Sequence, residues 1–448
     1  MDIVGLIPSF GGALYTIGAF VIALSIIVAV HEYGHYIVGR WSGIKAEVFS
    51  LGFGPVLFAR EDKHGTVWQV ALLPFGGYVK FLGDANAASV GSDANDANHA
   101  GEVDPALLRQ TMHGAPLWAR AITVAAGPVF NFILSILVFS AFLFFRGTAA
   151  DPLTIDDLRP MPVAQELQVG DEILAIAGEP TPKVEEFDGF ISKLPIAPTL
   201  EYTLRRNGAE VTANAPHPYP PIVSGLTPGS AAMDADLQAG DVITAVDGTP
   251  ISTFEELREK VGASEGREMQ LAVWRNGEML DLALTPRTMD LPREDSTFET
   301  RYLIGITGGL LFSPQTETPG VGQAIAYGAN QTVYIIKSSL SGMYHMAVGA
   351  ISSCNLRGPV GIAQTSGAAA SQGLSSFIWF IAVLSTAVGL LNLFPIPVLD
   401  GGHLVFHAFE AVSGRPPSDK ALRIFMTIGL ALLGTLMVFA LTNDFFCP

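Results

Sequence analysis

The sequence predicts a polytopic α-helical membrane protein with four transmembrane helices, a membrane-associated β-hairpin and two tandem α+β domains outside the membrane. Three observations support this fold class. Of the 448 residues, 49% are hydrophobic and only 15% are charged, and the mean hydropathy of +0.39 is too high for an ordinary soluble protein. Four uncharged stretches are long enough to cross a bilayer as helices. The long segment between the second and third stretches contains an internal repeat.

The four candidate spans are stretches without charged side chains. They lie between Asp2 and His31, Arg120 and Arg146, Arg357 and Asp400, and Arg423 and Asp444, and the apolar part of the third runs roughly from Ser376 to Leu393. Each can cross a hydrocarbon core of about 30 Å. The first has no basic n-region and no small-residue cleavage site, so we expect a retained helix and not a cleaved signal peptide.

The distribution of charge predicts how the spans are oriented. The net charge is −17, yet Lys and Arg gather in the loop between the first two spans, and the segments before the first span and after the fourth contain none. The positive-inside rule therefore places residues 40–118 and 397–420 in the cytoplasm, with both termini and the segment of about 230 residues between spans two and three outside. The acidic surplus argues against nucleic-acid binding, which needs basic patches.

The two cysteines, Cys354 and Cys447, both fall on the predicted outer side. An oxidising compartment would permit a disulfide between them. Nothing in their spacing demands one, so two unpaired thiols are the simpler expectation. Neither cysteine is placed to act as a nucleophile.

Residues 46–80 predict a β-hairpin that dips into the membrane interface. Apolar, glycine-interrupted strands at 49–58 and 67–79 flank a turn at 63–65, and residues 83–104 predict a loose loop. Such strands cannot extend far as a sheet, but they can offer a short backbone edge to one extended peptide. We therefore expect substrate to bind by backbone pairing at Val48 and Val70. The alternative is that the hairpin only anchors the chain in the membrane.

The outer segment contains two similar modules. Gly170-Asp-Glu-Ile173 is answered 70 residues later by Gly240-Asp-Val-Ile243, and Arg206-Asn-Gly208 is answered 69 residues later by Arg275-Asn-Gly277. Each module alternates strand-like segments with one short helix, at 185–194 and at 253–261. A tandem of two α+β modules is the simplest account.

These modules resemble PDZ domains of the bacterial type, and the second, from Thr227 to Pro286, is the fuller match. It departs from the family at Asp236, where glycine is usual, and the first module lacks a clear Pro-Gly-Ser segment. The resemblance implies capture of peptide termini by strand addition, or steric filtering of substrates. The alternative is a structural spacer with a closed groove. Beyond the modules, residues 320–374 are too polar for a fifth span and predict an amphipathic helix on the outer face.

The first span ends in His31-Glu32-Tyr33-Gly34-His35. On a helix the two histidines lie one turn apart on one face, where both can bind one metal ion. Zinc binds two imidazoles readily, and Glu32 is then placed to take a proton from water. Such strings also arise by chance in soluble helices, but ionisable side chains at the end of a membrane span are costly and usually functional. The motif therefore predicts a zinc site with Glu32 as general base.

A catalytic zinc needs a third protein ligand and one open position. Asp400 is the candidate, because the first and third spans run in the same direction and end at the same membrane depth. Pro395 and Pro397 interrupt the helix before it, and irregular backbone at that depth is tolerated only where it is buried in protein or lines a cavity. The alternative is that Asp400 only marks the end of the third span in water.

Other polar residues near this depth have two interpretations each. His403 and His407 are four apart with Glu410 beyond, but no carboxylate lies between them to act as a base, so ordinary interfacial histidines are the preferred interpretation. Asn131 in the second span and Asn392 at the end of the third lie at this depth, where a buried amide can hold a water, a metal ligand or a substrate carbonyl. We expect both to contact substrate, where an amide can stabilise a developing oxyanion. The alternative for both is helix packing.

Together these features resemble the site-2 protease family of intramembrane zinc metalloproteases over nearly the whole chain. The carriers are residues 31–35, 49–55, 74–80, 126–131, 357–362 and 392–403 with the two repeats. The resemblance implies Zn²⁺ bound by His31, His35 and Asp400, with Glu32 as base and Asn392 on the substrate. It also implies a bacterial inner-membrane enzyme whose substrate is a single-span anti-sigma factor already trimmed on the outer side. Such an enzyme acts in regulated intramembrane proteolysis during an envelope stress response.

The expected domains follow from these assignments. They are 1–45 (first transmembrane helix), 46–118 (re-entrant β-hairpin and cytoplasmic loop), 119–147 (second transmembrane helix), 150–216 and 217–287 (the PDZ-like domains), 288–374 (linker and amphipathic helix) and 375–448 (third and fourth transmembrane helices with the aspartate motif). Two other function classes fit less well. A membrane-anchored PDZ scaffold with a structural metal would need four protein ligands, and only three good ones plus a base are found. A metal transporter would need ionisable residues along the spans, and the middles of these four have none.

Overall fold

The computed structural model describes residues 6–83, 105–227, 229–293 and 297–447, so almost all of the loop expected at 83–104 lies outside the described residues. The chain divides into two compact units. The membrane unit comprises Met1–Ala141, Ile325–Tyr344 and Ser353–Pro448. The modular unit comprises Phe142–Ala324 and His345–Ser352.

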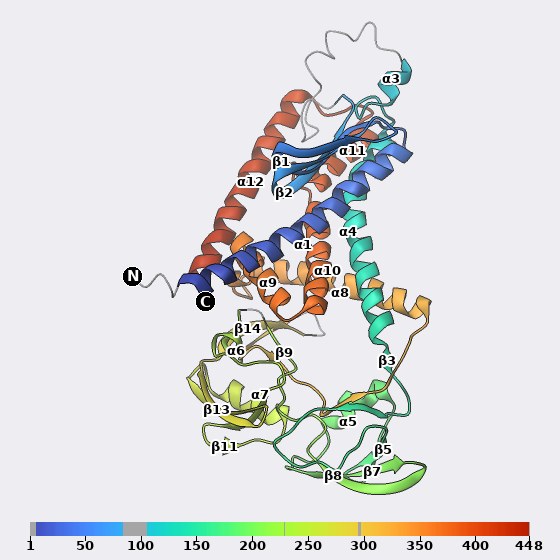
Figure 1. Ribbon diagram of the computed structural model, residues 1–448. Coiled ribbons are helices and arrows are strands. Elements are labelled where there is room, and N and C mark those ends of the chain that lie inside the picture. Colours follow the sequence, from blue (N-terminus) through green and yellow to red (C-terminus); the bar gives the residue numbers. More distant parts are fainter. Residues whose placement is uncertain (1–5, 84–104, 228, 294–296, 448) are drawn as a thin grey trace. The chain divides into compact units, whose positions relative to one another are not determined.

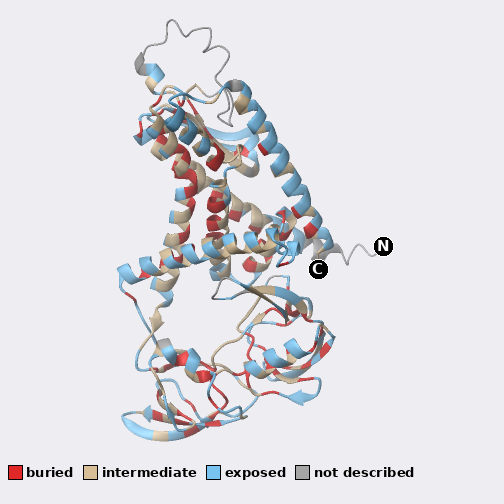
Figure 2. Cartoon of the chain, turned by 180° about the vertical axis from the view of Figure 1, so that it is seen from behind, coloured by how far each residue is buried: buried red, intermediate tan, exposed pale blue. Residues whose placement is uncertain are grey.

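The membrane unit contains the four expected spans (Figure 1). Among the described residues, four helices are long and apolar enough to cross a membrane: α1 (Leu6–Trp41), α4 (Leu117–Arg146), α10 (Leu374–Asn392) and α12 (Asp419–Phe446). The prediction of four spans is confirmed. Large apolar side chains such as Ile428, Leu432 and Val438 are exposed on α12, as expected of a helix face that meets lipid. Figure 2 shows most of this helix in the colour of exposed residues.

Small residues bring α1, α4 and α10 into close contact. A Cβ added at Gly34 on α1 would collide with the main chain of α4 at Ala126, and one added at Gly389 on α10 would crowd Pro128 and Asn131 of α4. Membrane helices associate through such small-residue contacts because lipid offers no hydrophobic driving force between them. The three helices that position the candidate site are therefore packed directly against one another.

Four further α-helices among the described residues belong to this unit in whole or in part. They are α3 (Pro105–Arg109), α8 (Val321–Ala347), α9 (Pro359–Ser371) and α11 (Asp400–Ser413). α8 is the helix expected within residues 320–374, and it is not among the candidate spans. α9 packs on the first half of α1, where Gly367 lies against Thr16.

The expected hairpin is present as β1 (Ala46–Glu61) and β2 (Val67–Phe81). Each strand bends at glycines, with Gly52, Gly54 and Gly76 in left-handed backbone conformations, so different parts of the two strands pair with each other more than once. Val48 faces both Lys80 and Val67, and Val70 faces both Leu51 and Phe58.

This register changes where an incoming peptide could pair. Val48 and Val70 have strand partners on both sides, so the expectation of an open edge at these two residues is wrong. The segment Gly77–Val79 has a sheet partner in the described residues only on its Phe49–Leu51 side. It is therefore an edge of the sheet.

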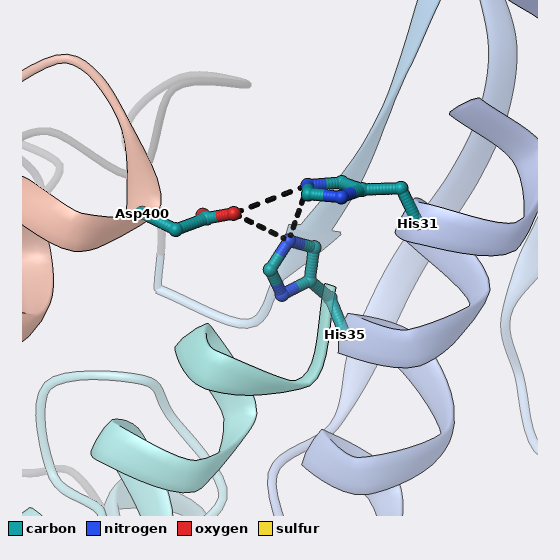
Figure 3. A group of neighbouring side chains, drawn as sticks. All are labelled: His31, His35 and Asp400. Atoms are coloured by element: carbon teal, nitrogen blue, oxygen red, sulfur yellow. Dashed lines mark hydrogen bonds and ion pairs between the residues drawn. The ribbon is translucent and has the colours of Figure 1, made fainter. Parts of the chain in front are cut away.

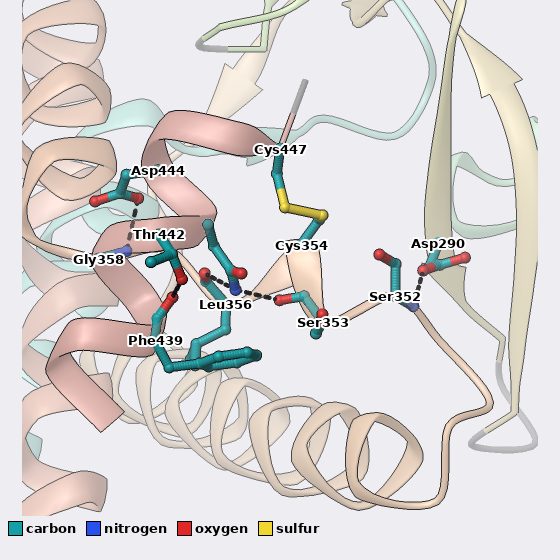
Figure 4. The surroundings of a disulfide bond; sticks show 11 residues. Asp290, Ser352, Ser353, Cys354, Leu356, Gly358, Phe439, Thr442, Asp444 and Cys447 are labelled. Carbon is teal, nitrogen blue, oxygen red and sulfur yellow. Dashed lines mark hydrogen bonds between the residues drawn. A yellow bond between two sulfur atoms is a disulfide. The ribbon is translucent and has the colours of Figure 1, made fainter. Parts of the chain in front are cut away.

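The two cysteines form a disulfide, so the expectation of free thiols is wrong (Figure 4). The carboxylate of Asp444, in the last turn of α12, accepts hydrogen bonds from the backbone N–H groups of Gly358 and Val360 at 2.7 and 3.0 Å. These bonds hold the end of α12 against the start of α9. They leave the Cα atoms of Cys354 and Cys447 5.5 Å apart, within the range for a disulfide. A sequence separation of 93 residues hides this proximity.

The modular unit contains two four-stranded sheets whose strands pair in the same relative order. One sheet, ordered β6-β5-β7-β8, consists of β5 (Glu172–Ile176), β6 (Glu179–Pro180), β7 (Leu200–Arg206) and β8 (Ala209–Ala215). The other, ordered β11-β10-β12-β13, consists of β10 (Val242–Val246), β11 (Thr249–Pro250), β12 (Met269–Arg275) and β13 (Glu278–Leu284). The short helices are η2 (Val184–Glu186), α5 (Phe187–Ile191), α6 (Ala231–Asp234) and α7 (Phe254–Ala263).

The repeated residues serve the fold of each module. Asp171 and Asp241 are each 1% exposed, and each accepts a 2.7 Å hydrogen bond from the Nε of Arg206 or Arg275, the arginine of the repeated Arg-Asn-Gly segment. Burial raises the pKa of Asp171, but the bonds from Arg206 and Gln168 lower it further, so this carboxyl is ionised at neutral pH. Asp236 has a φ of +59°, which accounts for the usual glycine at this position.

The second module is nested within the first. The remaining strands pair in twos: β3 (Thr148–Ala149) with β18 (Thr316–Glu317), β4 (Ile155–Leu158) with β17 (Phe312–Pro314), β9 (Gly225–Leu226) with β16 (Ile306–Thr307), and β14 (Arg287–Pro292) with β15 (Phe298–Leu303). Ile304 belongs to the second core, while Leu311 and Phe312 belong to the first. The expected boundary at 287 is therefore too early, because residues assigned to a linker complete both cores.

Candidate metal centre

Three predicted ligands come together inside the membrane unit (Figure 3). His31 and His35 lie one turn apart on α1, and Asp400 is the first residue of α11, after the irregular segment that follows α10. The Nε2 atoms of the two histidines are 3.2 Å apart. Oδ2 of Asp400 lies 3.1 Å from Nε2 of His31 and 3.6 Å from Nε2 of His35. In the part of the chain that the structure describes, this is the one group of three or more such ligands that could share a metal ion.

The dimensions of this triangle fit zinc. Two ligand atoms about 2.0–2.1 Å from a tetrahedral zinc are separated by about 3.3 Å. The three measured edges scatter around that value. Oδ2 of Asp400 is buried and accepts no well-aligned hydrogen bond, which leaves its lone pairs free for a metal.

A glycine of α4 makes room for both imidazoles. A Cβ at Gly127 would lie 2.6 Å from Cε1 of His35 and 2.7 Å from Cε1 of His31. Real Cβ contacts of this length essentially do not occur. Pro128 follows in the same helix and is buried. The Gly-Pro pair of the second span therefore lies against the two imidazole rings.

The second ring nitrogen of each histidine has a polar neighbour on α4. Nδ1 of His35 lies 2.8 Å from the main-chain oxygen of Thr123, and Nδ1 of His31 lies 3.2 Å from Nδ2 of Asn131. Thr123 could not be identified from sequence, because its contribution is a backbone carbonyl. Asn131 is fully buried and touches a candidate ligand.

The site opens into a cavity of about 570 Å³ that also contains the predicted base and one predicted amide. Glu32 and Asn392 both line it, together with the edge residues Gly77, Tyr78 and Val79. The Asn392 amide donates to the carbonyl of Val388 at 3.1 Å and keeps its oxygen available. Sequence reasoning placed the accessible edge elsewhere, since register cannot be read from composition.

The same cavity also contains the rival histidine pair. His403 and His407 line it, but they form no ligand cluster with a third described residue. Burial lowers the pKa of His407 to about 4, and Arg120 and His403 add to the effect, so the ring is neutral at pH 7. Glu410 is instead engaged by Arg120 in two hydrogen bonds of 3.0 and 2.6 Å, which tie α11 to α4.

Comparison with known proteins places the chain in a family. A family model described as peptidase family M50 matches residues 19–436. The chain is 36% identical to an Agrobacterium fabrum protein named as a zinc metalloprotease, over 95% of this chain and 94% of that protein. It is 35% identical to a Rhizobium meliloti protein with the same description, over 96% of both chains. It is 31% identical to the regulator of sigma-E protease RseP of Salmonella typhimurium, over 96% of this chain and 98% of that protein.

The match covers all three candidate ligands, the candidate base and both asparagines. The relatives are aligned over nearly their full lengths, so the likeness extends to the modules as well as the helices. The chain therefore belongs to peptidase family M50, the site-2 protease family, and is a zinc-dependent metalloendopeptidase.

Proposed function

We propose that this chain hydrolyses a peptide bond in or near the transmembrane segment of single-span membrane proteins, with zinc held by His31, His35 and Asp400. The observation that carries the proposal is one cavity, inside a unit of membrane-spanning helices, lined by the ligand triangle, a carboxylate and a strand edge. A soluble substrate would need no site at this place. The triangle leaves one coordination position open, as a catalytic zinc requires.

The roles of the side chains follow from their places around this cavity. A zinc ion supplies Lewis-acid polarisation of a carbonyl and lowers the pKa of water. Glu32 follows His31 directly and borders the same space, so it is placed to take a proton from the attacking water and give it to the leaving amine. Asn392 offers an amide to the substrate backbone.

The edge Gly77–Val79 is the proposed docking strand for substrate. A helical peptide bond is shielded by its own hydrogen bonds, so the substrate must unwind, and its freed backbone groups need partners away from water. This edge borders the cavity at Gly77, Tyr78 and Val79, and strand addition would supply those partners. We therefore assign to this segment the backbone pairing with substrate that was expected at Val48 and Val70.

Proline substitution tests this docking strand. Val79→Pro removes an N–H at the edge and restrains Tyr78, whereas Val79→Ala keeps the backbone intact. We expect Val79→Pro to abolish cleavage at normal zinc content and Val79→Ala to retain most of it. Equal cleavage rates for the two variants would contradict backbone pairing. Thr66→Ala, which removes a hydrogen bond to the Ala46 carbonyl of β1 and leaves the β2 backbone intact, serves as a control for general damage to the sheet.

The disulfide supports the proposed orientation in a bacterial inner membrane. Disulfides persist in oxidising compartments such as the periplasm. Cys447 follows the end of α12, so an outer C-terminus agrees with the positive-inside rule applied to the loops. Counting back through four spans gives an outer N-terminus, outer modules and a metal site near the cytoplasmic side. A membrane-impermeant label applied to intact spheroplasts tests this orientation. It should react with both termini if they lie outside the inner membrane.

The two modules are proposed PDZ-like domains that control access to the site. Their equal strand order supports two copies of one fold, the first formed by residues 148–216 with 310–318 and the second by 217–307. The proposed substrate is an anti-sigma factor trimmed on the outer side, by analogy with the relative named regulator of sigma-E protease. Such an enzyme would act in an envelope stress response.

Zinc analysis tests the ligand assignment. We expect one zinc per wild-type chain and little in His31→Ala, His35→Ala or Asp400→Ala, because each leaves only two ligands. His407→Ala is the matched control, since that histidine lines the same cavity outside the triangle. Full zinc content in Asp400→Ala, or loss in His407→Ala, would move the site to the rival pair.

A further inference from the structure

The two nitrogens of the His31 ring have different surroundings. Nε2 faces His35 and Asp400, at 3.2 and 3.1 Å. Nδ1 lies 3.2 Å from the side-chain amide of Asn131. If zinc binds at Nε2, as in the proposed function on which this inference rests, the neutral ring carries its proton on Nδ1. That N–H then needs an acceptor.

His35 shows how the same requirement is met one turn away. Its Nδ1 lies 2.8 Å from the carbonyl oxygen of Thr123, which can only accept. Nδ1 of His35 therefore holds the proton, and Nε2 presents its lone pair to the metal. In the described part of α4, no backbone carbonyl bonds to Nδ1 of His31. The side chain of Asn131 occupies the corresponding place.

An amide can be donor or acceptor according to which end it presents, and its hydrogen bonds decide which. Rotation by 180° about the last side-chain torsion exchanges oxygen and nitrogen and puts Oδ1 of Asn131 next to Nδ1 of His31. Oδ1, at the other end of the amide, is buried and has no hydrogen-bond partner among the described residues. No bond at that end therefore holds the amide in its donor orientation.

We propose that Asn131 is a positioning residue, which accepts the Nδ1 proton of His31 through Oδ1 and so holds His31 in the tautomer that binds zinc. The main chain around it is fixed. The hydroxyls of Ser385 on α10 and Ser135 on α4 donate to the Asn131 carbonyl at 2.9 and 3.0 Å, and all three residues are fully buried. The amide therefore has a defined place between the metal site and the α4–α10 contact.

This role replaces the substrate contact expected for Asn131. Its side chain is 0% exposed and does not line the cavity that Asn392 lines. A neutral amide also suits this place better than a carboxylate, because a buried charge inside a helix bundle is costly. Asn131 therefore acts on the substrate only through His31.

Zinc affinity in the absence of substrate separates these roles. The full chain, purified in detergent and stripped of metal, is titrated with zinc against a chromophoric chelator. Asn131→Leu removes the acceptor at similar volume, and we expect zinc affinity to fall by about 10–100-fold, the usual effect of losing a partner of a metal-bound histidine. Asn131→Asp keeps an acceptor and loses the donor, and we expect it to bind zinc far more tightly than Asn131→Leu.

The controls make each outcome decisive. Thr386→Ala removes a buried hydroxyl that donates to the Ala382 carbonyl of the same helix, and the variant should bind zinc as wild type does. Asn131→Ala repeats the comparison if the leucine variant does not fold. Wild-type affinity in Asn131→Leu and Asn131→Ala, or an Asn131→Asp as weak as they are, would overturn the inference. Unchanged affinity in His31→Ala would instead contradict the zinc assignment itself.

Discussion

Gly127 offers a sharp test of how closely the helices hold the metal site. In Gly127→Ala the new methyl carbon would lie 2.7 Å from Cε1 of His31, whereas ordinary contact begins at 3.4 Å. The ring, or α4 itself, must therefore move by about 0.7 Å, and His35 is crowded from the same side. Metal–ligand distances tolerate shifts of only about 0.2 Å. The substitution should therefore damage zinc binding before it damages the fold.

The matched control is Gly18→Ala on α1, where an added Cβ meets nothing within 4 Å. Alanine favours a helix over glycine by about 1 kcal/mol, so this variant should be neutral or stabilising. We expect Gly127→Ala to lose at least tenfold in zinc affinity while the Gly18→Ala protein binds zinc normally. Zinc titration against a chelator and thermal unfolding measure the two effects. If Gly127→Ala binds zinc with wild-type affinity, the imidazoles are not confined by α4 and the reasoning fails.

Three further predictions concern regions outside the site. Replacing residues 151–314 by a two-residue turn should leave zinc binding and cleavage of a pre-trimmed substrate intact. The two ends of the deletion already lie together, because β3 pairs with β18 and the Ala150 N–H donates to the Gln315 carbonyl at 2.8 Å. A folded, zinc-loaded variant without activity would refute this prediction. Cys447→Ser should lower the melting temperature, since a disulfide closing a loop of this length contributes about 2–4 kcal/mol, and an unchanged melting temperature would count against it. Asp62→Asn should remove acid sensitivity of the β1–β2 turn, measured by hydrogen exchange as a function of pH.

The sign of the Asp62 effect follows from its partners. Burial raises its pKa, but hydrogen bonds from Trp68, the backbone of Thr66 and His64, and Tyr36 lower it to about 2. A carboxyl with a depressed pKa stabilises the fold above its unfolded value of about 3.9 and loses that contribution as pH falls towards 2. Protection of the turn should therefore persist at pH 5 and decline between about pH 4 and 2. If the protection of the turn declines equally with falling pH in wild type and Asp62→Asn, another group causes the acid sensitivity.

The sequence predicts the membrane unit better than the modular unit. Uncharged stretches and the His-Glu motif are local signals, so four spans and the spacing of His31 and His35 follow directly from them. Asp400 could be placed because two spans of the same direction end at the same depth. Each of these inferences depends on residues close in sequence or on a single geometric constraint.

Contacts between distant residues explain what was missed. The prediction of an open backbone edge at Val48 and Val70 depended on the register of the two strands. The bends at Gly52 and Gly76 change that register. The bond between Cys354 and Cys447 depends on how the end of α12 packs. The nesting of the modules depends on a strand, Phe312–Pro314, that returns to a core 150 residues earlier in the chain. None of these leaves a periodic pattern in the sequence.

The central claim is that a zinc site inside the membrane unit cuts a transmembrane segment. The most direct measurement is mass spectrometry of products from a single-span substrate incubated in lipid with wild type or Glu32→Gln. The account predicts that both proteins bind one zinc, and that only wild type cleaves, within or next to the apolar segment. Cleavage by Glu32→Gln at the wild-type rate, or cleavage confined to the soluble part of the substrate, would contradict it.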